Sequence, residues 1–197
     1  MKKRIGIYTG TFDPVHVGHL GFAVRALDAA KLDEVVFIPE KRPREKDRVT
    51  DLQHRFELLV RAIEPYEGLL VRLLEPEQFC VRGTMPALRD MFGDAELCML
   101  LGSDVVKTFP ERWANLDDLF ENMELVIGLR KGDTRKGLKK MLKSLDVHIK
   151  PRYTFVDSPI AAASSTRIRR GHVVRDMPPE VSTYVQKHHL YRTGKEG

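Results

Sequence analysis

The sequence is poor in cysteine, poor in aromatic residues and without a long apolar run, and each shortage excludes a class of protein. Only Cys80 and Cys98 occur among 197 residues, far apart and without a CxxC pair, which excludes a disulfide framework and gives no sign of a zinc site. The apolar run after "MKKR" ends at Thr9, too early for a signal peptide, and no stretch reaches the ~18 apolar residues that span a membrane. We therefore expect a cytoplasmic protein with no membrane partner.

The charge balance favours anionic partners. Lys and Arg total 33 against 28 Asp and Glu, a net charge of +5 with a pI of about 9.2, which suits nucleotides and acidic metabolites. RNA is an alternative that basic stretches such as "RKGDTRKGLKK" leave open. Because aromatic residues make up only 8% and show no stacking pattern, we expect no nucleic-acid partner.

Apolar runs alternate with amphipathic segments along the chain. The runs predict strands at residues 4–9, 34–39, 68–74, 96–102, 123–130 and 153–158, the third of which could also be helical. Between and after them, the patterns predict helices near residues 19–30, 52–63, 85–91 and 134–145 and in the tail from Pro178. This alternation predicts a doubly wound, Rossmann-like α/β fold, with a parallel sheet covered by helices on both faces. Hydrophobic residues make up 42%, enough for one domain over residues 1–197.

The stretch "TGTFDPVHVGH" follows the first strand and begins a helix near Val17. Ligands of open α/β sheets bind at the carboxyl ends of the strands, where Gly10 lets the backbone approach phosphate and free helix amides favour its charge. His16 and His19 bracket Gly18 at a spacing that puts both on one side. The alternative is a plain turn with a core histidine. The stretch has neither the P-loop nor the GxGxxG pattern.

"GTFDPVHVGH" resembles the signature of the HxGH nucleotidyltransferases, in the form found in bacterial nicotinate mononucleotide adenylyltransferases. "LGSDVVKTFPERW", "SSTRIRRG" and the closing "MPPEVSTYVQKHHLYR" resemble further motifs of that family in the same order. The resemblance covers essentially the whole chain. It implies a single nucleotidyltransferase domain, with a C-terminal helical segment of about residues 164–192 packed on it.

The resemblance implies transfer of AMP from ATP to the phosphate of nicotinate mononucleotide, with release of pyrophosphate, in NAD biosynthesis. It assigns catalysis to His16, His19 and Arg169. The implied ATP-binding residues are Gly10, Thr11, Phe12, Gly18, Gly102, Asp104, Ser164, Ser165 and Thr166. Mg²⁺ would accompany ATP, held by phosphate oxygens and water, so no protein metal site is expected.

On the acceptor side, the resemblance implies Lys46, Thr84 and Trp113, and here the chain also departs from the family. "PREK" stands where a Pro-Pro-His-Lys-like run is usual, and "CVRGTM" where a Tyr-Thr-x-x-Thr-Leu segment is usual. Arg55 matches a further basic position near phosphate, and Arg82 is a candidate partner for a carboxylate. Nicotinamide mononucleotide or phosphopantetheine as acceptor, and a non-catalytic nucleotide-binding protein, therefore stay open, as does the oligomeric state.

Overall fold

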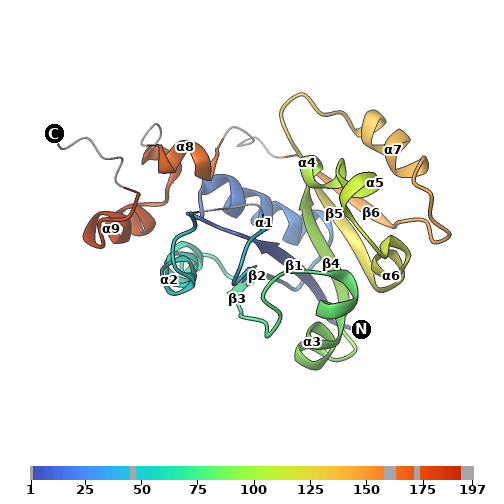
Figure 1. Ribbon diagram of the computed structural model, residues 1–197, viewed down its shortest axis with the longest axis horizontal. Coiled ribbons are helices and arrows are strands. Elements are labelled where there is room, and N and C mark those ends of the chain that lie inside the picture. Colours follow the sequence, from blue (N-terminus) through green and yellow to red (C-terminus); the bar gives the residue numbers. More distant parts are fainter. Residues whose placement is uncertain (1, 45–47, 158–162, 171–173, 192–197) are drawn as a thin grey trace.

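The structure is a computed structural model that describes residues 2–44, 48–157, 163–170 and 174–191. Within these ranges the chain forms a parallel sheet of six strands in the order β3-β2-β1-β4-β5-β6 (Figure 1). The strands are β1 (Arg4–Gly10), β2 (Glu34–Pro39), β3 (Leu69–Val71), β4 (Glu96–Gly102), β5 (Met123–Leu129) and β6 (Tyr153–Asp157). All six predicted strands and the doubly wound fold are confirmed.

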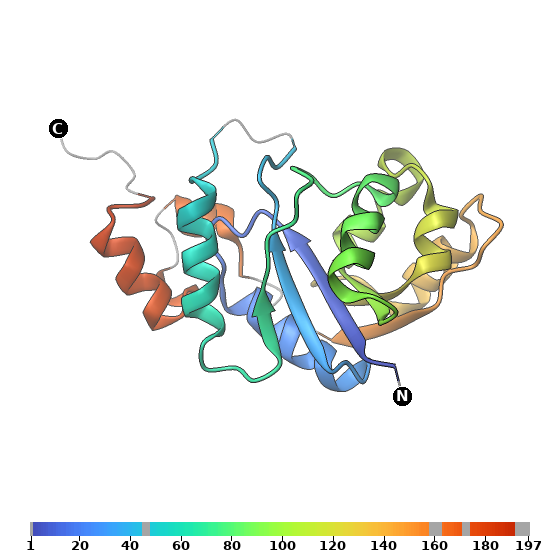
Figure 2. The ribbon, with the colours of Figure 1, turned by 90° about the horizontal axis from the view of Figure 1, so that it is seen from below.

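Helices cover both faces of the sheet, as predicted. The helices are α1 (Val17–Ala29), α2 (Leu52–Ile63), α3 (Val81–Phe92), α4 (Ser103–Val106), α5 (Phe109–Arg112), α6 (Leu116–Asn122), α7 (Arg135–Lys143), α8 (Ser165–Arg169), the 3₁₀ turn η1 (Val174–Asp176) and α9 (Pro179–Lys187). Figure 2 shows α2 and α9 side by side at one end and α3 and α6 at the other. The fourth strand is expected to lead into a helix, and the structure has three short ones there, α4 to α6. The helix α3 begins at Val81, one turn before the predicted Met85.

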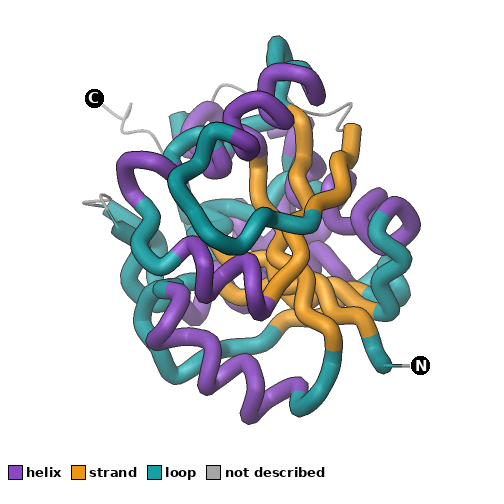
Figure 3. Tube along the Cα trace, turned by 90° about the vertical axis from the view of Figure 1, so that its right-hand side faces the viewer, coloured by secondary structure: helices purple, strands orange, loops and turns teal. Residues whose placement is uncertain are grey.

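Alternating residues of each central strand pack into two separate cores. Ile5 and Ile7 of β1 face the core beneath α3 to α7, whereas Phe37 of β2 and Leu100 of β4 face the core beneath α1, α2 and α9. Figure 3 shows the strands running through the middle with helices around them. Burial on both faces explains why these strands read as continuous apolar runs. Within the described ranges, every helix is too short or too polar to cross a bilayer.

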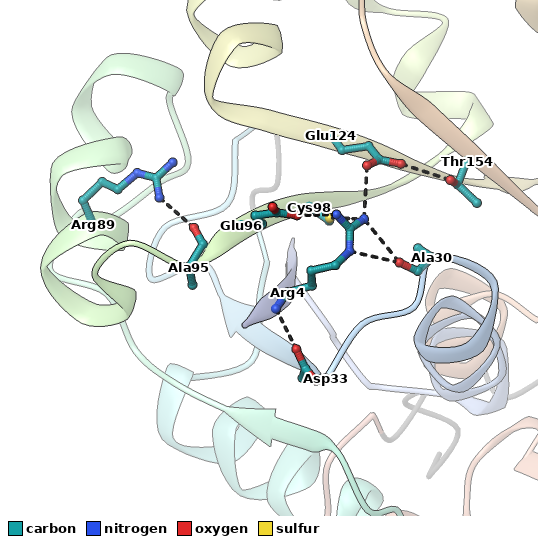
Figure 4. Close-up of polar contacts among 9 residues, drawn as sticks. All are labelled: Arg4, Ala30, Asp33, Arg89, Ala95, Glu96, Cys98, Glu124 and Thr154. Carbon is teal, nitrogen blue, oxygen red and sulfur yellow. Dashed lines mark hydrogen bonds and ion pairs between the residues drawn. The ribbon is translucent and has the colours of Figure 1, made fainter. Parts of the chain in front are cut away.

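At the amino ends of the strands, Arg4 ties α1 to the sheet (Figure 4). Its guanidinium donates to the carbonyl oxygen of Ala30, which caps α1, and pairs with Glu96 at 2.5 Å and Glu124 at 3.1 Å. Thr154 donates in turn to Glu124 at 3.1 Å. The positive charge of Arg4 interacts favourably with the negative, C-terminal end of the α1 dipole. The network therefore fixes the end of α1 opposite to the one that carries the histidines.

Both cysteines are free thiols. Cys98 is buried beside Arg4, and burial raises the pKa of its thiol to about 11, so that it stays protonated at neutral pH. This agrees with the expectation that cysteine has no role in cross-linking the fold.

Candidate active site

The strands β1, β4 and β5 end close together, and their carboxyl ends carry the predicted phosphate residues. On one side β1 pairs with β2, the next strand in the sequence, and on the other side it pairs with β4. The strand order therefore reverses at the boundary between β1 and β4. Such a boundary leaves a crevice outside the strand ends. Gly10 ends β1 and Gly102 ends β4, so the structure brings these two predicted residues to the same crevice.

Phe12 fixes the loop that leaves β1. Its φ is +48°, a left-handed conformation that costs a non-glycine residue of order 1–3 kcal/mol unless the surroundings hold it. The ring is 3% exposed and packs edge-on against Tyr8, His19 and Phe37 with centroids 5.1 to 5.4 Å apart. The loop thus has a rigid aromatic floor, directly below one of the predicted catalytic histidines.

His16 and His19 lie together, as their spacing predicts. Their rings stack with centroids 3.7 Å apart and planes 18° from parallel. The backbone N–H of His16 donates to Nδ1 of His19 at 3.2 Å. Because Nδ1 accepts this bond, the ring proton of His19 is assigned to Nε2.

His16 is buried and neutral. It is 3% exposed, and burial, with a smaller contribution from the positive charge of Arg130, lowers its pKa to about 4. Within the described ranges, no full hydrogen bond reaches its buried Nδ1, although the side chain faces the backbone N–H of His19 in a capping box. A buried polar atom without a partner costs about 1–3 kcal/mol, which a polar ligand group would recover.

A small cavity opens beside the two histidines. Its volume is about 20 Å³, and it is lined by Tyr8, His16, Gly18, His19, Phe22, Gly102, Gly128, Leu129 and Arg130. This volume holds roughly one water-sized group. Arg130 was missed by the sequence reasoning, although it directly follows the fifth strand. Its guanidinium pairs with Asp104 at 3.1 Å, which places the predicted Asp104 at the rim.

Helix α8 contacts the loop between β1 and α1. Ser165 Oγ donates to the carbonyl oxygen of Pro14 at 2.9 Å, and Arg169 donates to that of Asp13 at 2.5 Å. Arg169 also donates to Thr166 Oγ1 at 3.3 Å, and Ser164 precedes the first turn of α8. Two motifs about 150 residues apart in sequence therefore meet at one loop.

Two of the three predicted acceptor residues, Thr84 and Trp113, lie away from the histidine cavity. Trp113 is half-buried between Phe79 and Phe109, with ring centroids 6.0 and 5.0 Å away, on the other core. Thr84 is 1% exposed, and its Oγ1 accepts the backbone N–H of Cys80 at 3.0 Å, which ties the hydroxyl to the start of α3. Neither residue lines the histidine cavity. Lys46 lies outside the described residues.

One of the two segments that depart from the family pattern contacts the residues just before the other. Arg44 of "PREK" donates to Gln78 at 2.9 Å and to the carbonyl oxygen of Phe79 at 3.3 Å, directly before "CVRGTM". Arg82 is exposed and hydrogen-bonds to Asp118. The two departures thus lie near each other, beside the ring of Phe79 and its neighbour Trp113.

Arg55, matched to a basic position near phosphate, has an anchoring role in this structure. It is 1% exposed and donates to the carbonyl oxygens of Thr50 at 2.7 Å, Thr11 at 2.9 Å and Lys41 at 3.4 Å. Its guanidinium supports the loop between β1 and α1 through the bond to Thr11. Arg55 therefore holds the predicted Thr11 in place, with its guanidinium already hydrogen-bonded.

The fold and these residues define the class: an α/β nucleotidyltransferase with paired histidines at the switch point of its sheet. The cytidylyltransferase-like family model matches residues 7–171, and the chain belongs to this family. The resemblance inferred from the sequence is confirmed. "Probable nicotinate-nucleotide adenylyltransferase" of Clavibacter michiganensis subsp. michiganensis is 34% identical, over 98% of this chain and 96% of its own. The protein of the same name from Clostridium perfringens strain SM101 is 32% identical, over 96% and 98%.

A solved structure shares the fold. Plasmodium falciparum nicotinic acid mononucleotide adenylyltransferase complexed with NaAD superposes with a TM-score of 0.78 at 18% identity, covering 96% of this chain and 97% of that one. At this identity, the likeness supports the architecture alone.

Proposed function

We propose that this protein transfers the AMP group of ATP to the phosphate of nicotinate mononucleotide and releases pyrophosphate. The observation that carries the proposal is the meeting of the stacked pair His16 and His19 with Arg169 of α8 at one loop. The names of the curated relatives, which match the chain over nearly its full length, support the same reaction. The substrates are small anionic molecules, in keeping with the positive net charge.

The residues act by positioning and charge stabilisation, with no covalent enzyme intermediate. Nε2–H of His19 and the free amides at the start of α1 donate to phosphate oxygens of ATP, and His16 is available as a neutral hydrogen-bonding group. Arg169, with the hydroxyls of Ser165 and Thr166, stabilises the charge that develops on the leaving pyrophosphate. Gly102 and Asp104 lie at the end of β4, where the ribose of ATP would lie.

Mg²⁺ would enter with ATP as part of the substrate. The donor groups at the site are imidazole N–H, guanidinium, hydroxyl and amide, which suit phosphate oxygens rather than a hard cation. Among the described residues, no group of three His, Cys, Asp or Glu side chains is arranged to hold a metal ion. The residues present therefore fit phosphate groups that carry their own ion.

We propose the acceptor side at Trp113 and Phe79, with Lys46 and the backbone near Thr84 as further contacts. An aromatic face is suited to stacking on a pyridine ring. The change at Arg44 and Cys80 bears on this side, so nicotinamide mononucleotide and phosphopantetheine are the competing acceptors. We further propose one domain over residues 1–197, which the packing of α9 on α2 supports.

An acceptor panel tests the reaction. Purified protein is incubated with Mg²⁺, ATP or CTP, and each of the three acceptors, and pyrophosphate release is measured. We expect release with ATP and nicotinate mononucleotide. His19→Ala should lower kcat/KM by about 10²–10³, the usual cost of one lost transition-state donor.

His148→Ala is the matched control, because His148 is an exposed histidine in the loop after α7. It should leave the rate unchanged. Absence of pyrophosphate release with every acceptor, together with ATP binding by the parent protein, would favour the non-catalytic alternative.

A further inference from the structure

Asp13 is a buried carboxylate where distant segments of the chain meet. It is 2% exposed and lies in the loop between β1 and α1. The hydroxyl of Tyr191 donates to its Oδ1 at 2.7 Å, and the backbone N–H of Thr50 donates to its Oδ2 at 3.3 Å. Tyr191 lies 178 residues further along the chain, just past α9. The carboxylate thus links the loop between β1 and α1 to the segment just before α2 and to the C-terminal segment.

Two cations lie beside this carboxylate, Arg169 and the buried Arg55, and the guanidinium of Arg55 is already bonded to three carbonyl oxygens. Nη1 of Arg169 lies 4.0 Å from Oδ2 of Asp13 while donating to the backbone oxygen of the same residue at 2.5 Å. The side chain of Arg169 is 28% exposed, so it is accessible to a ligand. Asp13 and a bound phosphate would therefore compete for the same positive charge.

Tyr191 is held in place as a permanent donor. Burial, and secondly the negative charge of Asp13, raise the pKa of its phenol, which keeps the hydroxyl protonated. The backbone of Tyr191 has a φ of +60°, a left-handed conformation that an L-residue keeps only where its contacts hold it. The hydrogen bond to Asp13 is one such contact.

We propose that Tyr191 is a positioning residue for ATP binding, a role that rests on the proposed function. By donating to Asp13, its hydroxyl satisfies one oxygen of the carboxylate and leaves Arg169 available to the phosphates. Without this donor, the buried carboxylate is short of one hydrogen bond, and Arg169, 4.0 Å away, can supply it. The C-terminal segment then controls the affinity for ATP through two side chains, without touching the nucleotide itself.

Tyr191→Phe tests this role against Tyr184→Phe. Tyr184 also loses one hydroxyl bond, at 2.9 Å to His54, but on the α2/α9 contact away from the loop. ATP affinity is measured by calorimetry without acceptor, and kcat and both KM values by pyrophosphate release. We expect Tyr191→Phe to raise the Kd and KM for ATP about tenfold, the equivalent of one hydrogen bond to a charged group. The KM for the acceptor and the ATP affinity of Tyr184→Phe should stay at the parent values.

Asp13→Asn provides the second measurement, because its amide can accept from Tyr191 but no longer attracts Arg169 electrostatically. ATP should bind this variant at least as tightly as the parent, and adding Tyr191→Phe should change the Kd less than about twofold. Three outcomes would each overturn the inference. They are parent-like ATP affinity in Tyr191→Phe, an equal loss of ATP affinity in Tyr184→Phe, and a tenfold higher Kd for ATP in Asp13→Asn. A parent protein that binds no ATP contradicts the proposed function instead.

Discussion

At the scale of single residues, identical side chains take different roles according to what surrounds them. His16 is buried and neutral, whereas His19 has its tautomer fixed by a backbone N–H. Arg55 and Arg169 were both assigned to phosphate from the sequence, yet Arg55 is hydrogen-bonded to three carbonyl oxygens and Arg169 stays partly exposed. Residue type therefore identified the chemistry available, and burial determined how it can be used.

The burial of His16 makes stability depend on pH. Its pKa is about 4 in the folded protein and near 6.5 in an unfolded chain, so the unfolded state takes up its proton first as the pH falls. The stabilisation is complete above about pH 6.5 and is lost progressively toward about pH 4, by up to about 3 kcal/mol. In urea denaturation at both pH values, His16→Gln should lose less stability on acidification than the parent. Equal losses in parent and variant would contradict the burial of a neutral His16.

At the scale of secondary-structure elements, strands were easier to predict than helix starts. Each strand is an apolar run that is buried on both faces, so local sequence suffices. The sequence predicts the start of α3 at Met85, and Gly83, a poor helix former, lies just before that point. The structure begins it at Val81, which is buried, and closes its first turn with the bond from Cys80 N–H to Thr84 Oγ1. Tertiary packing overrides the propensity there.

The contact between β5 and α1 gives a prediction at this scale. A Cβ at Gly128 would lie 2.9 Å from the ring of Phe22, so Gly128→Ala must displace the ring and the helix that carries the histidines. Overpacking of this kind costs about 1–3 kcal/mol. We expect a lower free energy of unfolding and weaker ATP binding, measured by urea denaturation and calorimetry.

Phe22→Leu provides the control for this contact. In the double variant with Gly128→Ala, the smaller side chain should remove most of the clash. The loss of stability should then be smaller than the sum of the two single losses. Simple additivity would show that the two residues do not press on each other.

At the scale of the whole molecule, the positive charge is concentrated in one segment. Residues 130–152 contain nine Lys or Arg and two Asp, a net charge of +7, whereas the chain as a whole carries +5. The remainder is therefore net negative, at −2. The segment begins at the site, with Arg130 at the cavity and Arg135 paired at 2.6 Å with Asp157 at the end of β6. Its field is placed to attract anionic substrates toward the carboxyl ends of the strands.

This asymmetry predicts a salt-dependent capture of ATP. Raising the ionic strength from about 50 mM to about 500 mM should lower kcat/KM for ATP while kcat changes little, because screening acts on encounter. Replacing the exposed Lys139 and Lys143 by Glu should lower the low-salt kcat/KM and flatten its salt dependence. Lys2 and Lys3 lie at the amino ends of the strands, and their side chains are 59% and 50% exposed. Replacing these two by Glu should change the low-salt kcat/KM less. Equal effects of both pairs would mean that net charge alone matters.

The sequence by itself determined the doubly wound α/β class, the loop with His16 and His19, and the family, because these depend on short-range patterns of apolar residues and on motifs. Only the tertiary structure decided that Arg130 joins the cavity, that Arg55 and Thr84 are buried with their polar groups engaged, and that Tyr191 reaches Asp13. Each of these facts depends on which loops meet at the ends of the strands. Such meetings bring together residues far apart in sequence, and no local pattern encodes them.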